Sequence, residues 1–270
     1  MQLRGRNALL TGGSGGLGPY IGRALAREGV NLALAARRPE PIEATAGELR
    51  ELGVRAVAIA ADISEPAERE RLVERATAEL GQIDILVNNA GVERCARYLS
   101  LSPSFIEEMI QTNLVAPLVL ARLLLPAMLE RGSGHVVNVS SLSGKKGSPY
   151  VATYAATKAA LDQWTSGVRA ELRGTGVSAS AVLPGFIANT GMFATYRERA
   201  PRIAGETSPG KVAAAVVRSI RKDIQEIIVS PGPARALSVI NAMSPELASR
   251  VLRAAGVHDF FRRQAEENEE

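Results

Sequence analysis

Cysteine, histidine and long apolar runs are scarce in this sequence of 270 residues. Cys95 is its single cysteine, which excludes an internal disulfide and indicates a reducing compartment. The two histidines, His135 and His258, have no cysteine or carboxylate cluster beside them, so we expect no metal site. The most apolar run, residues 114–129, contains Arg122 and two prolines and falls short of the ~20 apolar residues that a membrane span needs.

The sequence also lacks a charged leader and a basic block. A strand-like segment, NALLT at 7–11, follows Met1 almost at once, so we expect no signal peptide, no stable membrane insertion and a cytoplasmic location. The formal net charge of +4 is spread over single arginines, which is typical of a solvated surface and does not favour nucleic acid as a partner. Arginine outnumbers lysine 27 to 5, which indicates a GC-rich bacterial genome.

Short apolar segments alternate with longer amphipathic ones along the chain. Hydrophobic residues make up 46% of the sequence, enough for a sizeable core. The short segments are apolar at nearly every position, as strands buried on both faces are. They are residues 7–11, 31–36, 55–60, 84–88, 135–140, 177–183 and 226–229. The helices expected between them are residues 19–29, 41–52, 66–80, 104–130, 150–174 and 209–221.

This alternation predicts an α/β fold, a Rossmann-type doubly wound parallel sheet of about seven strands with helices on both faces. There is no linker and no internal repeat, so we expect residues 1–270 to form a single domain in which 232–270 is a helical carboxyl-terminal extension. Ligands bind such sheets at the carboxyl ends of the strands. The loops that follow the strands should therefore hold the functional residues.

A glycine-rich loop, TGGSGGLG at 11–18, follows the first expected strand. Glycines permit a tight turn and let a pyrophosphate approach the backbone closely. Pro19 suits the first turn of a helix, so the helix amino terminus should point at the loop and favour an anion there. The order of strand, glycines and helix predicts dinucleotide binding, and a merely flexible turn is the alternative.

The loop resembles the TGxxxGxG pattern of the classical short-chain dehydrogenase/reductase (SDR) family, and the motif NNAG at 88–91 is similar to that family too. The matching loop positions are Thr11, Gly12, Gly16 and Gly18. The resemblance implies that the cofactor is also lined by Leu17, Asp62, Ile63, Asn89, Ala90 and Gly91. The resemblance implies that Asp62 contacts the adenine; alternatively, Asp62 is a helix cap or a turn residue. It also implies that Asn89 helps to stabilise the sheet.

The end of the second strand selects the nucleotide. An acidic residue there would hold the ribose 2′-hydroxyl of NAD, whereas an arginine accepts the 2′-phosphate of NADP. Ala36 stands where NAD-using members of the family carry Asp, and Arg37 and Arg38 follow it. A guanidinium suits a phosphate, and Ser14 could add a hydroxyl contact. We therefore predict NADP(H), with NAD(H) kept open by Glu40.

Tyr154 and Lys158 lie four residues apart on an expected helix, so they share one face at a spacing of about 6 Å along the axis. Ser141 precedes Tyr154 by 13 residues, at the end of the fifth strand. This Ser–Tyr–Lys spacing resembles the SDR active site, and Asn113 in QTNLVAP matches its fourth member.

The resemblance implies a role for each of these four residues. Reducing a ketone needs a hydride on carbon and a proton on oxygen, and Tyr154 would exchange that proton. A free tyrosine is a poor base at neutral pH, so the Lys158 cation would lower its pKa while also holding the ribose hydroxyls. Ser141 would hydrogen-bond the substrate oxygen. Asn113, at a local irregularity in its helix, would hold a water that relays protons.

Neighbouring residues compete for some of these roles. Tyr150 is a second phenol, but no lysine follows it four positions later. Ser140 and Ser143 flank Ser141 and could cap or line the pocket. Asn113 is alternatively an ordinary polar residue of its helix.

The segment PGFIANT at 184–190 follows the sixth strand and is similar to the family's PGxxxT segment. The resemblance implies cofactor contacts around the nicotinamide from Pro184, Gly185, Ile187 and Thr190. One extra residue precedes Thr190, so Asn189 is an alternative contact.

Two later segments bear on the substrate. We expect residues 192–208 to form a mobile lid over the substrate. This segment contains Phe193 and Tyr196 and also three arginines, Arg197, Arg199 and Arg202. The arginines either face water or select an acidic substrate. In the extension, Ser244 should begin a helix that Gly256 ends. Its apolar stripes could pack on the parent domain, contact another subunit, cover the substrate mouth or bind a membrane surface.

Together these features predict an NADP(H)-dependent oxidoreductase that interconverts a small-molecule carbonyl compound and a secondary alcohol, with Tyr154 as general acid and base. The family resemblance implies a homotetramer or homodimer, with the helices that hold Asn113 and Tyr154 at the interface. The alternatives are a redox sensor that binds NADP(H) without turnover, and an isomerase or dehydratase on the same scaffold.

Overall fold

The seven expected strands form one sheet. The computed structural model describes residues 1–196 and 198–268, so Arg197, Glu269 and Glu270 lie outside the described residues. The strands pair in the order β3-β2-β1-β4-β5-β6-β9, and all of these pairs are parallel. Their bounds are β1 Asn7–Thr11, β2 Asn31–Ala36, β3 Ala56–Ala60, β4 Ile85–Asn88, β5 Gly134–Val139, β6 Val177–Pro184 and β9 Glu226–Val229.

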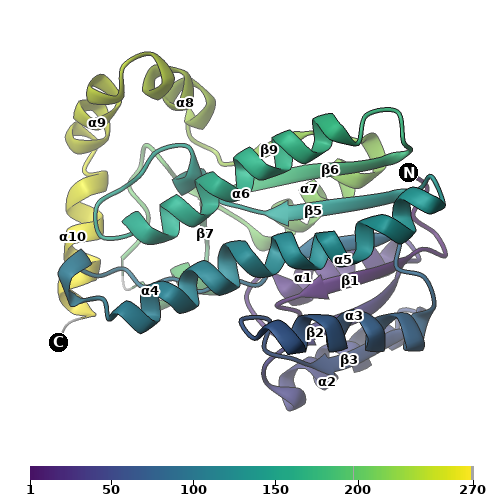
Figure 1. The fold of residues 1–270 in the computed structure, drawn as a ribbon. Helices are drawn as coiled ribbons and strands as arrows, with labels where there is room; N and C mark the ends of the chain where they lie inside the picture. The colour runs from purple at the N-terminus through teal and green to yellow at the C-terminus, as the bar shows by residue number, and fades with distance from the viewer. Residues whose placement is uncertain (197, 269–270) are drawn as a thin grey trace.

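Helices cover both faces of this sheet (Figure 1). On one face pack α1 (Gly18–Arg27), α2 (Pro39–Arg50) and α7 (Pro209–Lys222). On the other pack α3 (Pro66–Leu80), α5 (Ala116–Glu130) and α6 (Ala152–Glu171). The predicted fold class, a doubly wound parallel sheet between two helical layers, is confirmed.

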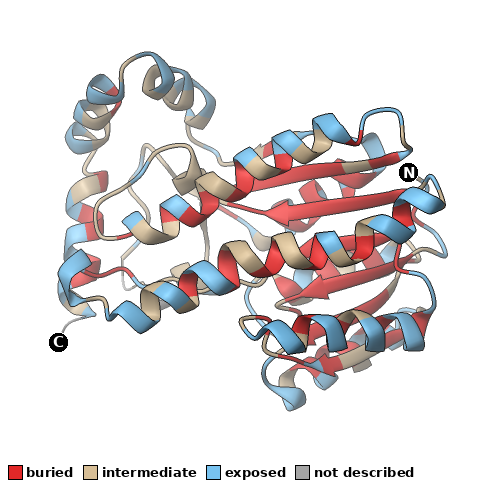
Figure 2. Ribbon diagram, viewed as in Figure 1, coloured by how far each residue is buried: buried red, intermediate tan, exposed pale blue. Residues whose placement is uncertain are grey.

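The two layers explain why the strands are apolar throughout. In β1, Ala8 and Leu10 belong to the core beneath α1, α2 and α7, whereas Leu9 belongs to the opposite core. All five residues of β1 are consequently buried. Figure 2 shows the same for the sheet as a whole, in which buried strands lie between helices that expose one side to solvent.

The helix expected over 104–130 is continuous but changes its winding part-way. It starts as α4 (Pro103–Ile110), passes through the π-helical turn η2 (Gln111–Val115) and continues as α5. By length and composition this run of 28 residues would be long enough to cross a membrane, which corrects the expectation that its apolar part is too short. Half of its most apolar window, 50%, is buried inside the protein, where Leu120 and Leu124 pack in the core.

Shorter elements complete the loops at the carboxyl ends of the strands. Within the expected lid, η4 (Gly191–Thr195) is followed by β8 (Glu206–Thr207), which pairs in parallel with β7 (Phe186–Ile187) just after β6. Two other short helical turns are η1 (Tyr98–Ser100) and η3 (Leu142–Gly144). The pairing of β7 with β8 ties the far end of the lid segment to the end of the sheet.

The carboxyl-terminal extension folds into three helices, α8 (Ala234–Met243), α9 (Pro245–Ala254) and α10 (Val257–Glu267). The predicted start of α9 is confirmed, since the Ser244 hydroxyl accepts a hydrogen bond of 3.3 Å from the Leu247 N–H. Gly256, with φ +75°, separates α9 from α10 as predicted. The sequence interpretation did not include α8.

The extension lies beyond the carboxyl ends of the strands rather than on either helical layer (Figure 1). Phe260 and Phe261 of α10 form a third core with Cys95 and Val151. The rings of Phe186 and Phe193, from the segments after β6, pack against the same core at centroid distances of 5.4 Å and 6.3 Å from Phe260. The extension therefore closes the end of the sheet where ligands are expected.

Candidate active site

A cavity of about 740 Å³ opens at the carboxyl ends of the strands. It crosses the position between β1 and β4 where the strand order reverses, the usual ligand site of open α/β sheets. The predicted residues that line it are Gly12, Ser14, Gly16, Leu17, Arg37, Arg38, Asp62, Ile63, Asn89, Ala90, Gly91, Ser141, Tyr154, Lys158, Pro184, Gly185, Ile187 and Thr190. Gly18 and Asn113 were also predicted, but they do not line it.

The glycine loop is shaped by close backbone contacts. Gly12 has φ +68°, and a Cβ there would lie 2.8 Å from the Asn89 side-chain nitrogen. A Cβ on Gly18 would lie 2.0 Å from the Gly12 carbonyl oxygen, so Gly18 lets α1 pack against the loop without itself reaching the cavity. Because α1 begins at Gly18, its first unpaired N–H groups are directed at the loop, an arrangement that favours a phosphate.

Asn89 fastens the loop after β4 to the loop after β1. Its side-chain nitrogen donates hydrogen bonds to the backbone oxygens of Thr11 (3.1 Å) and Gly12 (3.2 Å). The Thr11 hydroxyl in turn accepts hydrogen bonds of 3.1 Å from the N–H groups of Asn89 and Ala90. Asn89 thus lines the cavity and also holds its shape, as the sequence interpretation allowed.

The expected nucleotide end of the cavity is basic. Arg37 and Arg38 line it, and both are exposed. Arg37 Nη1 lies 3.3 Å from Glu108 Oε1, whereas Arg38 has no ion-pair partner among residues 1–196 and 198–268. Glu40, the residue that kept NAD(H) open, does not line the cavity.

Asp62 combines the two interpretations made for it. It lines the cavity beside Ile63, and its Oδ1 accepts hydrogen bonds from the Ser64 N–H (3.0 Å) and the Ser64 hydroxyl (2.7 Å). These bonds make it the first residue of a turn after β3. The turn residue alternative is therefore correct, and it is compatible with a position in the cavity wall.

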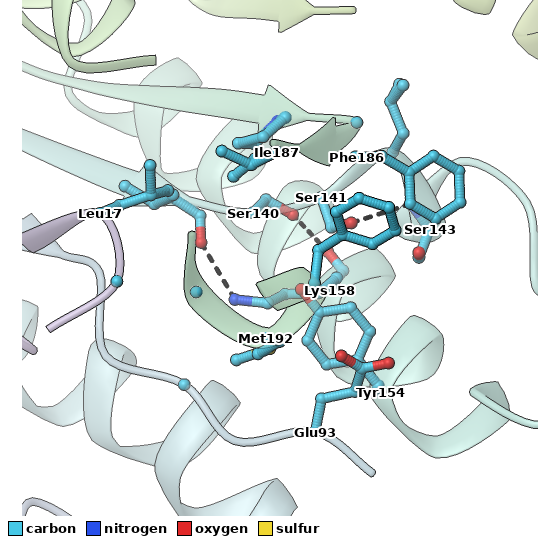
Figure 3. Close-up of a pocket in the computed structure, with 18 of the residues that line it drawn as sticks. Leu17, Glu93, Ser140, Ser141, Ser143, Tyr154, Lys158, Phe186, Ile187 and Met192 are labelled. Atoms are coloured by element: carbon cyan, nitrogen blue, oxygen red, sulfur yellow. Dashed lines mark hydrogen bonds between the residues drawn. The ribbon is translucent and has the colours of Figure 1, made fainter. Parts of the chain in front are cut away.

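Tyr154, Lys158 and Ser141 converge on the cavity from two elements. Tyr154 and Lys158 project from one face of α6, and Ser141 follows β5 (Figure 3). Lys158 Nζ lies 5.6 Å from the centre of the Tyr154 ring and donates a hydrogen bond of 3.0 Å to the Val139 oxygen. The competing serines line the cavity as well, but both bonds given for them are structural: the Ser140 hydroxyl donates to the Lys158 backbone oxygen, and the Ser143 N–H donates to the Ser141 hydroxyl.

The pKa of Tyr154 is raised, not lowered. Burial raises it most, the nearby Glu93 carboxylate raises it further, and a hydrogen bond with Ser141 lowers it. The lowering predicted from the Lys158 cation is wrong for the protein chain by itself, because burial of the phenol and the charge of Glu93 raise the pKa. Burial also lowers the pKa of Lys158 to about 8, although the charges of Asp162 and Glu93 act in the opposite direction.

Asn113 lies in the π-helical turn, where the sequence interpretation expected an irregularity. Its side chain is fully buried and pairs with the loop after β4. The Val92 N–H donates to Asn113 Oδ1 and Asn113 Nδ2 donates to the Val92 oxygen, both at 2.8 Å. These two bonds fix the loop that carries Gly91 and Glu93, so Asn113 shapes the cavity from behind its wall.

The segment after β6 forms the wall opposite α6. Pro184, Gly185, Ile187 and Thr190 all line the cavity, while Asn189, the alternative contact, does not. Asn189 instead takes a left-handed conformation with φ +52°. The extra residue is thus accommodated at Asn189, and Thr190 keeps its place in the wall.

Sequence reasoning missed part of this lining. Glu93, two residues after the NNAG motif, reaches into the cavity. So do residues of all three helices of the extension: Ala234, Leu237, Ser238, Ala248, Leu252, Val257 and Phe261. Of the four roles considered for the extension, packing on the parent domain and covering the mouth both agree with this position. The available signal for Glu93 was the position of its carboxylate, two residues after the NNAG motif at the end of β4.

Comparison with known proteins identifies the family. A family model described as short chain dehydrogenase matches residues 6–201. The chain belongs to the short-chain dehydrogenase family. The resemblance seen in the sequence is therefore confirmed, and the chain is an oxidoreductase of this family.

Several named relatives are similar to this chain over most of its length. A ketoacyl reductase, HetN, from Nostoc sp. is 40% identical over 269 residues, which cover 98% of this chain and 94% of that protein. A putative ketoacyl reductase from Streptomyces coelicolor is 37% identical over 193 residues, covering 71% of this chain and 74% of that protein. The crystal structure of a metagenomic short-chain oxidoreductase in complex with NADP has a TM-score of 0.73 and 31% identity, covering 85% and 98% of the two chains.

Proposed function

We propose that this short-chain dehydrogenase is NADP(H)-dependent and transfers hydride between that cofactor and a carbonyl compound or secondary alcohol, with Tyr154 as general acid and base. The observation that carries the proposal is one cavity with Tyr154, Lys158 and Ser141 at one part and the glycine loop and Arg38 at another. The solved relative in complex with NADP supports the nucleotide, and the two ketoacyl reductases support a carbonyl substrate.

The residues of the cavity fit a phosphorylated dinucleotide. The glycine loop and the amino end of α1 would hold the pyrophosphate, and Gly15, where nothing lies within 4 Å of an added Cβ, leaves the backbone open to it. The guanidinium of Arg38, which makes no ion pair with residues 1–196 or 198–268, would bind the 2′-phosphate. Asp62 and Ile63 would contact the adenine, and Lys158 the nicotinamide ribose. When bound, the nicotinamide would supply or accept the hydride, and its oxidised ring would add a positive charge.

Tyr154 would hold the proton that the substrate oxygen receives. Its raised pKa keeps the phenol protonated at neutral pH, which is the form that reduction of a carbonyl needs. Ser141, which already hydrogen-bonds Tyr154, would donate to the same substrate oxygen and stabilise the charge that develops there. In the reverse direction Tyr154 would act as base, and the cation of Lys158 would then favour the phenolate.

We also propose that the enzyme works on small molecules as a homodimer or homotetramer in the cytoplasm of a bacterium. Large apolar residues are exposed on and beside the helical run that was predicted to lie at the interface. They include Ile110 at 37% exposure, Leu129 at 41% and Leu99 at 95%. A second copy packed along α4 and α5 would cover them. Sedimentation or light scattering would measure the oligomeric state.

The test is a panel of ketones, aldehydes and alcohols, ketoacyl compounds included, read by NADPH absorbance. Tyr154→Phe should lower kcat on the order of 10²–10⁴-fold or more while the Kd for NADPH changes little. Tyr150→Phe, which removes the competing phenol, should leave kcat unchanged.

Three other outcomes would overturn the proposal. Tight NADPH binding without turnover of any compound would favour the redox sensor. Substrate conversion without net loss of NADPH would favour an isomerase or dehydratase. Full activity in Tyr154→Phe would remove the catalytic role of that phenol.

A further inference from the structure

Glu93 is a carboxylate in the wall of the cavity, and the proposed chemistry gives it no task. It follows the NNAG motif in the loop that Asn113 fixes, and its side chain lines the cavity. Figure 3 shows it reaching toward Tyr154 from the side opposite Ser141. Its negative charge raises the pKa of both Tyr154 and Lys158, so it acts electrostatically on these two residues.

One oxygen of this carboxyl group is already bound. The Tyr196 hydroxyl donates a hydrogen bond of 2.8 Å to Glu93 Oε1. Tyr196 is itself held by rings of the third core, at centroid distances of 5.4 Å from Phe193 and 5.8 Å from Phe260. Glu93 Oε2 has no hydrogen-bond partner among the described parts of the chain, and it is not enclosed by protein. The carboxyl group is thus oriented by one oxygen and leaves the other for a ligand.

The surroundings of Glu93 are apolar. Phe186, Phe193, Leu252, Val257 and Phe261 line the same part of the cavity. Burial raises the pKa of Glu93, and only the Tyr196 hydrogen bond and the charge of Lys158 act against this. A second carboxylate brought into this space would place two like charges between apolar walls, where their repulsion is stronger than in open solvent. A neutral group with an N–H or O–H would instead satisfy the open oxygen.

We propose that Glu93 determines substrate specificity: it accepts a hydrogen bond from a donor group that the substrate carries near its carbonyl, and it excludes substrates with a carboxylate at that place. This assignment rests on the proposed reduction of a carbonyl compound in this cavity. The preferred substrate then combines an apolar chain, which the extension and the lid surround, with one neutral donor close to the reacting carbon. Free oxo acids are poor substrates, and their neutral amides are good ones.

The test compares three forms of one oxo acid: the free acid, its methyl ester and its primary amide, in the β-oxo and γ-oxo series of octanoic acid. Their Kd values are measured by calorimetry on the Tyr154→Phe protein saturated with NADPH, where no turnover interferes. In the better-binding series, the amide should bind on the order of 10-fold tighter than the ester, and the acid on the order of 10-fold weaker than the ester.

Variants added to this background separate the two parts of the proposal. Glu93→Gln keeps size and an acceptor, so it should bring the acid close to the ester while the amide keeps part of its advantage. Glu93→Leu should also abolish the difference between amide and ester. Tyr196→Phe, which frees the carboxyl group to turn, should reduce the advantage of the amide and leave the acid excluded. Glu198→Gln makes the same change of charge in the lid segment outside the cavity lining; it weakens the ion pair with Arg263 on α10 but should change none of these ratios.

Equal binding of acid and ester by the parent protein, or no binding of any form in either series, would overturn the proposal. So would an amide preference that survives in Glu93→Leu, or a response of Glu198→Gln equal to that of Glu93→Gln. Circular dichroism of each variant verifies that it is folded. Failure of the wild-type enzyme to reduce any carbonyl would refute the proposed function but leave the order of these Kd values, and hence the role of Glu93, to be judged separately.

Discussion

Arg37 and Arg38 are neighbours in sequence but differ in what they already bind. Arg37 lies 3.3 Å from a carboxylate oxygen of Glu108 on α4, so part of its charge is compensated. Arg38 immediately precedes α2 in an extended conformation and makes no ion pair within the described chain. A phosphate that approaches this end of the cavity would therefore interact more strongly with Arg38.

Replacing these arginines should separate the two nucleotides. Arg38→Leu should raise the Kd for NADPH on the order of 10-fold or more, since a charge-assisted hydrogen bond contributes roughly 1.5–3 kcal/mol. Arg37→Leu should have a smaller effect, because its loss also releases Glu108. Neither change should affect NADH. Quenching titrations with both nucleotides measure this, and a larger loss in Arg37→Leu would show that the phosphate binds elsewhere.

The convergence of Tyr154, Lys158 and Ser141, the proposed catalytic residues, on one cavity could be predicted from the sequence because their spacing follows from regular elements. Tyr154 and Lys158 need only one helical face, and Ser141 needs only the end of a strand. Glu93 could not be predicted in the same way, because its partner Tyr196 lies 103 residues further along the chain. The pKa of Tyr154 was predicted in the wrong direction for a related reason, since it depends on the burial of the phenol and on that carboxylate, and neither can be read from local sequence.

At the scale of elements, the turn at 111–115 shows what periodicity can and cannot predict. An apolar pattern predicted one helix over 104–130, and a helix does run through this region. The π-helical turn η2 lies where Asn113 bonds both polar groups of the Val92 backbone. A pairing between a helix and a loop 21 residues away leaves no trace in local periodicity, although the family motif pointed to an irregularity there.

Removing the Asn113 side chain should therefore weaken the loop as well as catalysis. Asn113→Ala leaves the partly buried N–H and oxygen of Val92 without their amide partner, which should cost about 1–3 kcal/mol of unfolding free energy. Asn113→Asp keeps the acceptor for the Val92 N–H and should lose less. Urea unfolding gives both values. Wild-type stability in Asn113→Ala would mean that water replaces the amide and that the loop is held by other contacts, Asn89 first among them.

At the scale of the whole molecule, the sheet and the extension differ in how far they could be predicted. The strands were identified within about one residue because helices cover both faces of the sheet and make each strand uniformly apolar. The extension is built from contacts between distant segments, such as the edge-to-face contact of Phe260 with Phe186 and the hydrogen bond from Cys95 to the Phe261 oxygen. Helix signals predicted α9, but they could not say that α10 covers the substrate end of the cavity.

If the cofactor binds as proposed, this arrangement leaves the extension as a wall for the substrate. Of the residues assigned to NADP(H), none belongs to α8, α9 or α10, whereas Leu252, Val257 and Phe261 line the part of the cavity beyond Tyr154. Phe260 stands behind that wall, 1% exposed, and its ring contacts Phe186, Tyr196 and Phe261. Weakening its packing should loosen the wall without touching the nucleotide.

Phe260→Ala should reduce the packing free energy at this site by about 3–5 kcal/mol. Because Phe260 is not part of either core of the main sheet, the main consequence should be local opening of α10. We expect KM for the carbonyl substrate to rise on the order of 10-fold, since the chamber loses an ordered wall, while the Kd for NADPH stays unchanged. Met243→Ala, at a side chain that is 83% exposed on α8, serves as control and should alter neither constant. Hydrogen exchange should show faster exchange of the α10 amides in Phe260→Ala only.

An equal loss of NADPH affinity would instead mean that α10 supports the whole cavity, and an unchanged KM would mean that the substrate never reaches this wall.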